Sequence, residues 1–186
     1  MDTRQPEILV LLSGGIDSFA CADFFMSMGR SLCTLHVDYG QAAALPERRA
    51  ADRVAEFLDV AIAHLRLVPA TPKLSGEIPS RNAFLISVAA MERPSSVTAI
   101  ALGIHAGTTY PDCSSDFVER SNALLQVTKP SVQVVAPFLD WQKSDILEYC
   151  DRRHLPFGLT HSCERGDTPC GTCLSCLDRR EIDARA

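Results

Sequence analysis

The sequence predicts an α/β protein with a doubly wound parallel sheet and a metal-binding segment near its C-terminal end. Short apolar runs typical of buried strands alternate with longer segments of helical spacing, as in β–α units whose sheet is covered on both faces. The 186-residue chain is 46% hydrophobic and 22% charged, which fits a folded protein. We therefore expect residues 1–186 to form one domain, with the metal-binding segment at residues 156–180.

Strands and helices are expected in strict alternation. The expected strands are residues 8–12, 32–37, 61–67, 97–104 and 132–135. The expected helices are residues 19–26, 46–58, 82–91, 116–126 and 143–153. Ligands of such sheets bind beyond the carboxyl ends of the strands. The informative loops are then residues 13–17, 38–41, 78–82, 105–113 and 137–143.

The first of these loops is the most informative part of the chain. Residues 13–18 read Ser-Gly-Gly-Ile-Asp-Ser and join the first strand to the first helix. Glycines let the backbone turn tightly and present N–H groups to an anion, and a helix N-terminus adds partial positive charge. The alternative is an ordinary β–α turn with Asp17 and Ser18 as helix caps. Neither the Walker-type loop nor the dinucleotide-binding fingerprint is present.

Four of the eight cysteines form a tight cluster. Cys163, Cys170, Cys173 and Cys176 have the spacing C-x6-C-x2-C-x2-C, which suits tetrahedral Zn²⁺. An iron–sulfur cluster and a redox dithiol are the alternatives. Cys21, Cys33 and Cys150 are expected in the core, whereas Cys113 stands apart in a loop. His161 is interpreted as a second-layer or surface residue, because four thiolates already complete the site.

Composition excludes several classes of function. A net charge of −5 argues against broad nucleic-acid binding, which needs a basic face. No apolar run approaches the roughly 20 residues that span a bilayer, and the first residues lack a signal-peptide pattern. Cytoplasmic localisation without a membrane partner is therefore expected.

Several motifs occur along the chain in a characteristic order. Ser-Gly-Gly-x-Asp-Ser resembles the PP-loop of ATP pyrophosphatases, and it is followed by Asp-Tyr-Gly-Gln, Pro-x-Arg-Asn, Tyr-Pro-Asp-Cys and Pro-Phe-Leu-Asp-x2-Lys. Together with the four cysteines, this order resembles the 7-cyano-7-deazaguanine synthase family from about residue 8 to residue 180. The resemblance implies an adenine-nucleotide α-hydrolase-like fold with structural zinc, often dimeric.

The resemblance also implies an activity. The enzyme would adenylate the carboxylate of 7-carboxy-7-deazaguanine with ATP, releasing pyrophosphate. Ammonia would displace AMP to give an amide, and a second ATP would drive dehydration to the nitrile preQ0, a step of queuosine biosynthesis. ATP, Mg²⁺ and structural Zn²⁺ are the implied cofactors.

Candidate site residues follow from the same motifs. The ATP-binding candidates are Leu12, Ser13, Gly14, Gly15, Ile16, Asp17, Ser18, Asp38 and Lys143. The substrate-binding candidates are Arg81, Asn82, Tyr110 and Asp112. Asp17, Lys143 and Arg81 are the catalytic candidates. Lys143 and Arg81 are chosen because cations must offset the charges of the nucleotide and the carboxylate, and Asp17 because it belongs to the loop expected to hold the pyrophosphate.

Most of these residues have a structural alternative. Lys143 could be a solvated lysine at a helix start, and Arg81 part of a salt bridge at a helix N-terminus. Asn82 could cap that helix, and Pro111-Asp112 is also a turn signal. Cys113 is rejected as a nucleophile because no obvious base lies near it in the sequence.

Three segments depart from the family pattern and leave the amine acceptor open. Gln41 is followed by Ala42, Ala43 and Ala44 rather than by a histidine, residues 105–109 lack an acidic residue, and residues 67–78 are shortened. One alternative is a relative that stops at the amide or joins the deazaguanine to a protein N-terminus in antiviral defence. More distant alternatives are a tRNA-modifying PP-loop enzyme and a non-catalytic nucleotide-binding module.

Overall fold

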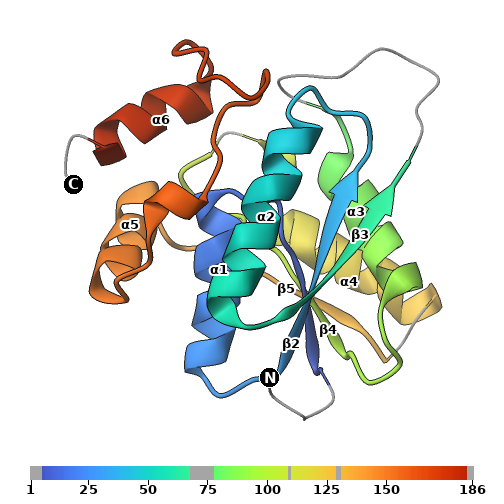
Figure 1. Cartoon of the computed structure of the whole chain (residues 1–186). Coiled ribbons are helices and arrows are strands. Elements are labelled where there is room, and N and C mark those ends of the chain that lie inside the picture. Colours follow the sequence, from blue (N-terminus) through green and yellow to red (C-terminus); the bar gives the residue numbers. More distant parts are fainter. Residues whose placement is uncertain (1–5, 68–77, 109, 129–130, 184–186) are drawn as a thin grey trace.

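Five parallel strands form one sheet at the centre of the computed structural model, which describes residues 6–67, 78–108, 110–128 and 131–183. The strands lie in the order β3-β2-β1-β4-β5, so the chain winds outwards in both directions from β1 (Figure 1). This confirms the expected doubly wound parallel sheet. The strands are β1 (Ile8–Leu11), β2 (Leu32–Asp38), β3 (Ala61–Arg66), β4 (Ala99–Ala101) and β5 (Gln133–Val135).

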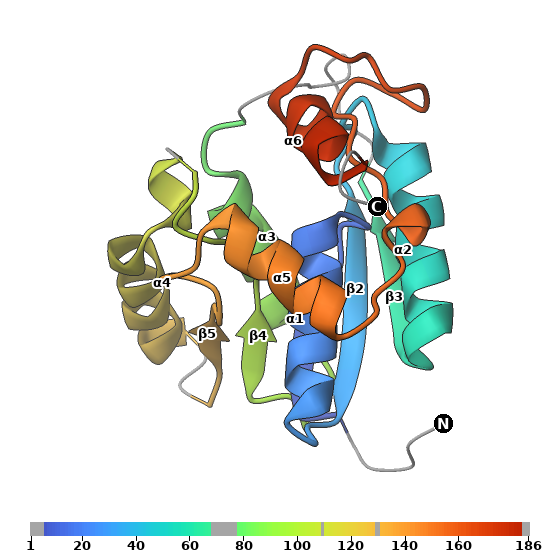
Figure 2. The same ribbon diagram turned by 90° about the vertical axis from the view of Figure 1, so that its left-hand side faces the viewer.

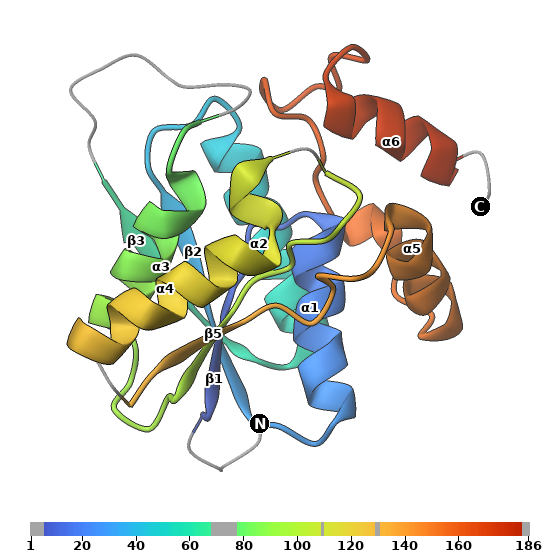
Figure 3. The same cartoon turned by 180° about the vertical axis from the view of Figure 1, so that it is seen from behind.

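Helices cover both faces of the sheet. One layer contains α1 (Ile16–Ser27), α2 (Ala44–Leu58) and α5 (Lys143–Arg152). The opposite layer contains α3 (Arg81–Glu92) and α4 (Ser115–Thr128), which lie in front of the sheet in Figure 3. A last helix, α6 (Leu174–Asp183), lies with the preceding loop at the edge where the strands end (Figure 2).

The alternation of side chains along β1 explains the two layers. Ile8 and Val10 pack with α1, α2 and α5, whereas Leu9 and Leu11 pack with α3 and α4. All four side chains are buried. A strand covered on both faces requires an unbroken apolar run, which is what residues 8–12 provide.

The expected elements are present with small shifts at their ends, and β4 is shorter than expected. A Cβ atom at Gly103 would lie 2.5 Å from the carbonyl oxygen of Asp17, so the chain passes directly against the start of α1. This close approach needs glycine and ends the regular ladder before Gly103. Helix α6 and the short 3₁₀ turn Phe157–Leu159 were not anticipated, whereas the 3₁₀ turn Pro111–Cys113 lies where the sequence has a turn signal. In the described ranges, no helix combines the length and apolar character needed to cross a membrane.

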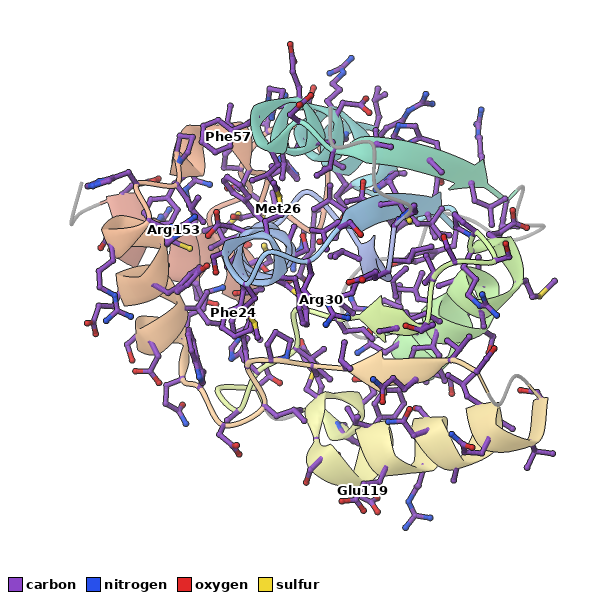
Figure 4. The ribbon with its side chains drawn as sticks, turned by 90° about the horizontal axis from the view of Figure 1, so that it is seen from below. Phe24, Met26, Arg30, Phe57, Glu119 and Arg153 are labelled. Atoms are coloured by element: carbon purple, nitrogen blue, oxygen red, sulfur yellow. The ribbon has the colours of Figure 1, made fainter. Side chains whose placement is uncertain are left out.

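A buried carboxylate joins α1 to α5. Asp23 is 5% exposed, and it accepts hydrogen bonds from the Tyr149 hydroxyl at 2.6 Å and from Arg153 Nε and Nη2 at 2.8 and 3.0 Å. Seen from below in Figure 4, α1 lies between α2, which carries Phe57, and the segment at the end of α5 that carries Arg153. Burial, followed by the hydrogen bond to Asp23, raises the pKa of Tyr149, so its hydroxyl stays protonated and donates.

We expect Asp23→Ala to lower the free energy of unfolding by about 2–4 kcal/mol, because the Tyr149 hydroxyl loses its acceptor and Arg153 loses its counter-charge. Urea denaturation at pH 7 measures the change. The matched control is Asp151→Ala on the exposed face of α5, which should change stability by less than about 0.5 kcal/mol. Equal effects of the two substitutions would contradict the role assigned to Asp23.

Candidate active site

The loops that follow β1, β4 and β5 meet at the carboxyl edge of the sheet. A parallel bridge joins His105 to Phe138 beyond the ends of β4 and β5, and the Ala106 N–H donates to the Trp141 carbonyl at 2.9 Å. These contacts bring His105 and the start of α5 to the loop at residues 13–18. Side chains far apart in the sequence therefore share one site.

The glycines of residues 13–18 fit the close turn expected there. Gly14 is buried with φ +83°, and a Cβ atom on it would collide with the Glu47 carbonyl and with Ala50 in α2. Gly15 is the N-cap of α1 and has no side-chain cap. Ser18 donates to the Gly15 carbonyl at 2.9 Å and lies 3.1 Å from the Ser13 hydroxyl.

Asp17 and Ser18 are thus not the caps of α1, because they lie in its first turn after Gly15. The N-cap residue of the helix is Gly15, which has no side chain that could bind the first N–H groups. A helix start of this kind is suited to bind an anion.

Asp17 lies between two basic side chains. Lys143 Nζ, at the start of α5, donates to Asp17 Oδ1 at 2.5 Å. His105 Nε2 lies 3.9 Å from Asp17 Oδ2. The Asp145 carboxylate accepts the Gln142 N–H at 2.7 Å, which fixes the turn that presents Lys143. Lys143 is therefore not a free surface lysine, although its side chain remains 26% exposed.

His105 is the functional candidate that the sequence analysis missed. It is 6% exposed, and its Nδ1 accepts the Gly107 N–H at 3.0 Å, so in the neutral ring Nε2 carries the proton. Burial lowers the pKa of His105, while Asp17 raises it and Lys143 lowers it further. The sequence did contain a signal for His105, since it is a polar residue that follows a buried strand at the carboxyl edge of the sheet. The comparison with the family pattern considered only the acidic residue that residues 105–109 lack.

A second set of polar side chains lies at the end of β2 and in the loop that follows it. Asp38 Oδ1 accepts the Gly40 N–H at 3.0 Å, and its Oδ2 lies 3.4 Å from Arg66 Nε. Tyr39 forms a side-chain hydrogen bond with Arg81, the first residue of α3. The structure thus places Arg81 beside this loop.

Asn82 and Asp112 bind each other. The Asn82 N–H donates to Asp112 Oδ2 at 3.3 Å, and its side-chain amide donates to the Asp112 carbonyl at 3.0 Å. Asp112 belongs to the 3₁₀ turn Pro111–Cys113, so the turn expected as one alternative is present. Asn82 is not the cap of α3, because Ser80 holds the N-cap position and Asn82 lies in the first turn. Tyr110 precedes that turn and is half-buried. Contacts of these residues with a substrate stay a prediction.

The four cysteines form a site that fits zinc. The sulfur atoms of Cys163, Cys170, Cys173 and Cys176 all lie within 4.8 Å of one another, and Cys170 and Cys176 are 4.0 Å apart. Tetrahedral Zn–S bonds of about 2.3 Å place sulfurs about 3.8 Å apart. Backbone N–H groups of Thr172 and Cys173 lower the pKa of Cys170 to about 5, which favours the thiolate that binds metal.

His161 connects the cysteine cluster to the loop at residues 13–18. Its backbone N–H donates to the Gly14 carbonyl at 2.9 Å, and its ring nitrogen Nε2 lies 2.9 Å from the Cys163 carbonyl oxygen. This contact with the backbone of Cys163 fits the expectation that His161 lies next to the metal site without being a ligand. The direct contact with Gly14 was not foreseen.

Comparison with known proteins identifies relatives across most of the chain. The family model described as "Queuosine biosynthesis protein QueC" matches residues 7–75 and 71–182. A 7-cyano-7-deazaguanine synthase from Haloarcula marismortui is 34% identical, with 99% of this chain and 91% of that protein covered. A second one, from Campylobacter curvus, is 31% identical, with 89% and 87% covered.

A solved structure supports the fold alone. The crystal structure of a predicted subunit of tRNA methyltransferase from Methanocaldococcus jannaschii is similar with a TM-score of 0.54 at 17% identity. The similarity covers 81% of this chain and 75% of that one.

We expect Cys176→Ser to remove bound zinc, because a metal site of four thiolates loses affinity with one ligand gone. Elemental analysis of the purified protein measures the metal, and limited proteolysis should then cut within residues 160–183, where thiolates hold the chain together. Cys33→Ser, in strand β2, is the control and should retain zinc. Zinc retained in Cys176→Ser would contradict the ligand assignment.

His105 should make the protein less stable at mildly acidic pH. Its pKa is lowered in the folded state, so the unfolded chain binds more protons as pH falls below the ordinary value of 6.5. The contribution of neutral His105 to the free energy of unfolding is therefore present above that value and declines from pH 7 to pH 5. Urea denaturation at both pH values should show a smaller decline for His105→Asn than for the wild type. An identical decline would show that His105 does not stay neutral in the folded protein.

Proposed function

Because the chain belongs to the QueC family of queuosine biosynthesis proteins, we propose that it is an ATP-dependent ligase acting on 7-carboxy-7-deazaguanine. In this reaction the substrate carboxylate attacks the α-phosphate of ATP, pyrophosphate leaves, and ammonia displaces AMP to give the amide. A second activation and the loss of water give the nitrile preQ0.

The observation that carries the proposal is the arrangement around Asp17. An uncapped helix start, a loop of two glycines and the Lys143 ammonium group converge on one point at the carboxyl edge. Backbone N–H groups and a fixed cation are the groups that stabilise charge on a transferring phosphoryl group. The neighbouring Arg81 supplies a second cation for the substrate carboxylate.

Each candidate residue has a role in the proposed complex. Ser13, Gly14, Gly15 and Ser18 surround the pyrophosphate, and Lys143 neutralises phosphate charge while Asp17 holds its ammonium group in place. Leu12 and Ile16 complete this loop, and Asp38 faces the ribose. Asn82, Tyr110 and Asp112 recognise the deazaguanine, whose amine and ring N–H groups suit carboxylate and carbonyl acceptors.

Metal ions have two separate roles in this proposal. Mg²⁺ would bridge phosphate oxygens at the loop, since it prefers oxygen ligands. Zn²⁺ at Cys163, Cys170, Cys173 and Cys176 would hold the C-terminal segment in place, and it would take no part in the chemistry.

A pyrophosphate-release assay with Mg-ATP and 7-carboxy-7-deazaguanine tests the proposal. Ser13→Ala, Asp17→Ala and Lys143→Ala should each lower the rate by on the order of 100-fold or more, since each removes a group that contacts or orients the reacting phosphates. Bound zinc should remain in all three variants.

Exposed residues of the same types provide matched controls. Ser87→Ala in α3 and Asp116→Ala in α4 should release pyrophosphate at the wild-type rate. Release that needs no carboxylate substrate, or that survives Lys143→Ala, would contradict the proposed activation.

A second candidate is a relative that stops at the amide or transfers the deazaguanine to a protein amine. The observation that favours it is the position of His105, which lies beside Asp17 within a segment that departs from the family pattern. The shortened stretch at residues 67–78 lies largely outside the described residues. Mass spectrometry of products formed with ammonia separates the candidates: a nitrile supports preQ0 synthesis, and an amide that does not react further supports the second candidate.

A further inference from the structure

Glu47 is a titratable group beside the anion-binding loop that the proposed reaction leaves without a role. It lies in the first turn of α2, whose backbone packs directly against Gly14. Burial raises the pKa of Glu47 above its usual range. Burial of a carboxylate costs free energy, and titratable groups with shifted pKa values cluster at functional sites.

The orientation of the Glu47 carboxylate is fixed by Gln41. The Gln41 amide donates from Nε2 to Glu47 Oε2 at 2.8 Å and to the Val37 carbonyl at 3.3 Å. Its oxygen Oε1 accepts the Tyr39 N–H at 2.9 Å. These two backbone partners determine which end of the amide is which, so Gln41 presents an N–H to Glu47.

Charged groups face Glu47 from three other elements. Arg81 of α3 and His161 of the C-terminal segment lower its pKa, while Asp38 of β2 raises it. Arg81 also interacts with the Tyr39 hydroxyl, and the Tyr39 backbone N–H is bound by the same Gln41 that holds Glu47. If Arg81 binds the substrate carboxylate and residues 13–18 bind the phosphates, Glu47 would lie near the reacting carboxylate, because it interacts with Arg81 and its backbone packs against Gly14.

We propose that Glu47 binds the incoming ammonium ion and removes a proton from it, so that neutral ammonia forms next to the activated carboxylate. This inference rests on the proposed function and assigns the amine side of the same site. Its chemical basis is that the ammonium ion has no lone pair and cannot attack, whereas a carboxylate both attracts the cation and accepts its proton.

The step balances without a further reactant. Glu47 takes one proton from the ammonium ion and becomes a carboxylic acid. The nitrogen lone pair forms a C–N bond to the acyl carbon, and the bond from that carbon to the AMP oxygen breaks with its electron pair on AMP. The nitrogen of the adduct then loses a second proton to solvent, which gives the neutral amide. Glu47 releases the proton that it took from the ammonium ion to solvent before the next turnover.

The raised pKa of Glu47 sets the expected pH dependence. Glu47 works as a base only when it is deprotonated, so amide formation should decline as pH falls through its pKa. Pyrophosphate exchange into ATP, which reports activation of the carboxylate alone, should not decline with it.

The test separates activation from amine transfer in Glu47→Gln. We expect Glu47→Gln to exchange pyrophosphate into ATP within a few-fold of the wild type and to form amide from ammonium on the order of 100-fold more slowly. Hydroxylamine, which is largely neutral at pH 7, should restore product formation, since it needs no base to become a nucleophile. The matched control is Glu56→Gln on the exposed side of α2, with wild-type rates throughout.

Two results would overturn the inference. One is amide formation from ammonium by Glu47→Gln at the wild-type rate. The other is the loss of both pyrophosphate exchange and amide formation in Glu47→Gln, because Glu47 would then act before the amine arrives. A wild-type protein that exchanges no pyrophosphate would instead contradict the proposed function, so the two failures are distinguishable.

Discussion

The ion pair between Asp17 and Lys143 is the contact on which the arrangement of the site depends. It joins residues 126 positions apart, one in the first turn of α1 and one at the start of α5. At the other end of the same helices, Asp23 binds Tyr149 and Arg153. Two polar links and an apolar contact between them therefore fix α5 against α1. The phosphate-binding role proposed for Lys143 needs this fixed position, because electrostatic stabilisation is effective when the groups are already in place.

The C-terminal segment contacts the loop at residues 13–18 and helix α2 through separate interactions. Residues 156–176 contain little apolar surface, and the sulfur atoms of the four cysteines gather there instead of a hydrophobic core. His161 joins this segment to the carbonyl of Gly14, and Arg53 of α2 donates to the Leu159 carbonyl at 3.0 and 3.2 Å. The cysteine cluster and the loop at residues 13–18 are thus connected through a short stretch of backbone.

Local patterns predicted most of the fold and part of the site. The apolar run of β1 and the glycines at residues 14 and 15 determine local structure directly, so both could be read from the sequence. Helix α6 could not, because its position follows from the cysteine cluster and not from an apolar face. His105 and Glu47 were missed for a related reason: their significance lies in partners from distant loops, Asp17 and Gln41, that only the folded chain brings close.

In the proposed function, this edge of the sheet activates a carboxylate by joining it to AMP. Incubation of the protein with ATP and 7-carboxy-7-deazaguanine labelled with oxygen-18 in its carboxylate tests the claim, with ammonia as acceptor and mass spectrometry of the released nucleotide. If the carboxylate is activated in this way, the released AMP carries one labelled oxygen from the substrate. Unlabelled AMP, or label found in inorganic phosphate with formation of ADP, would contradict it.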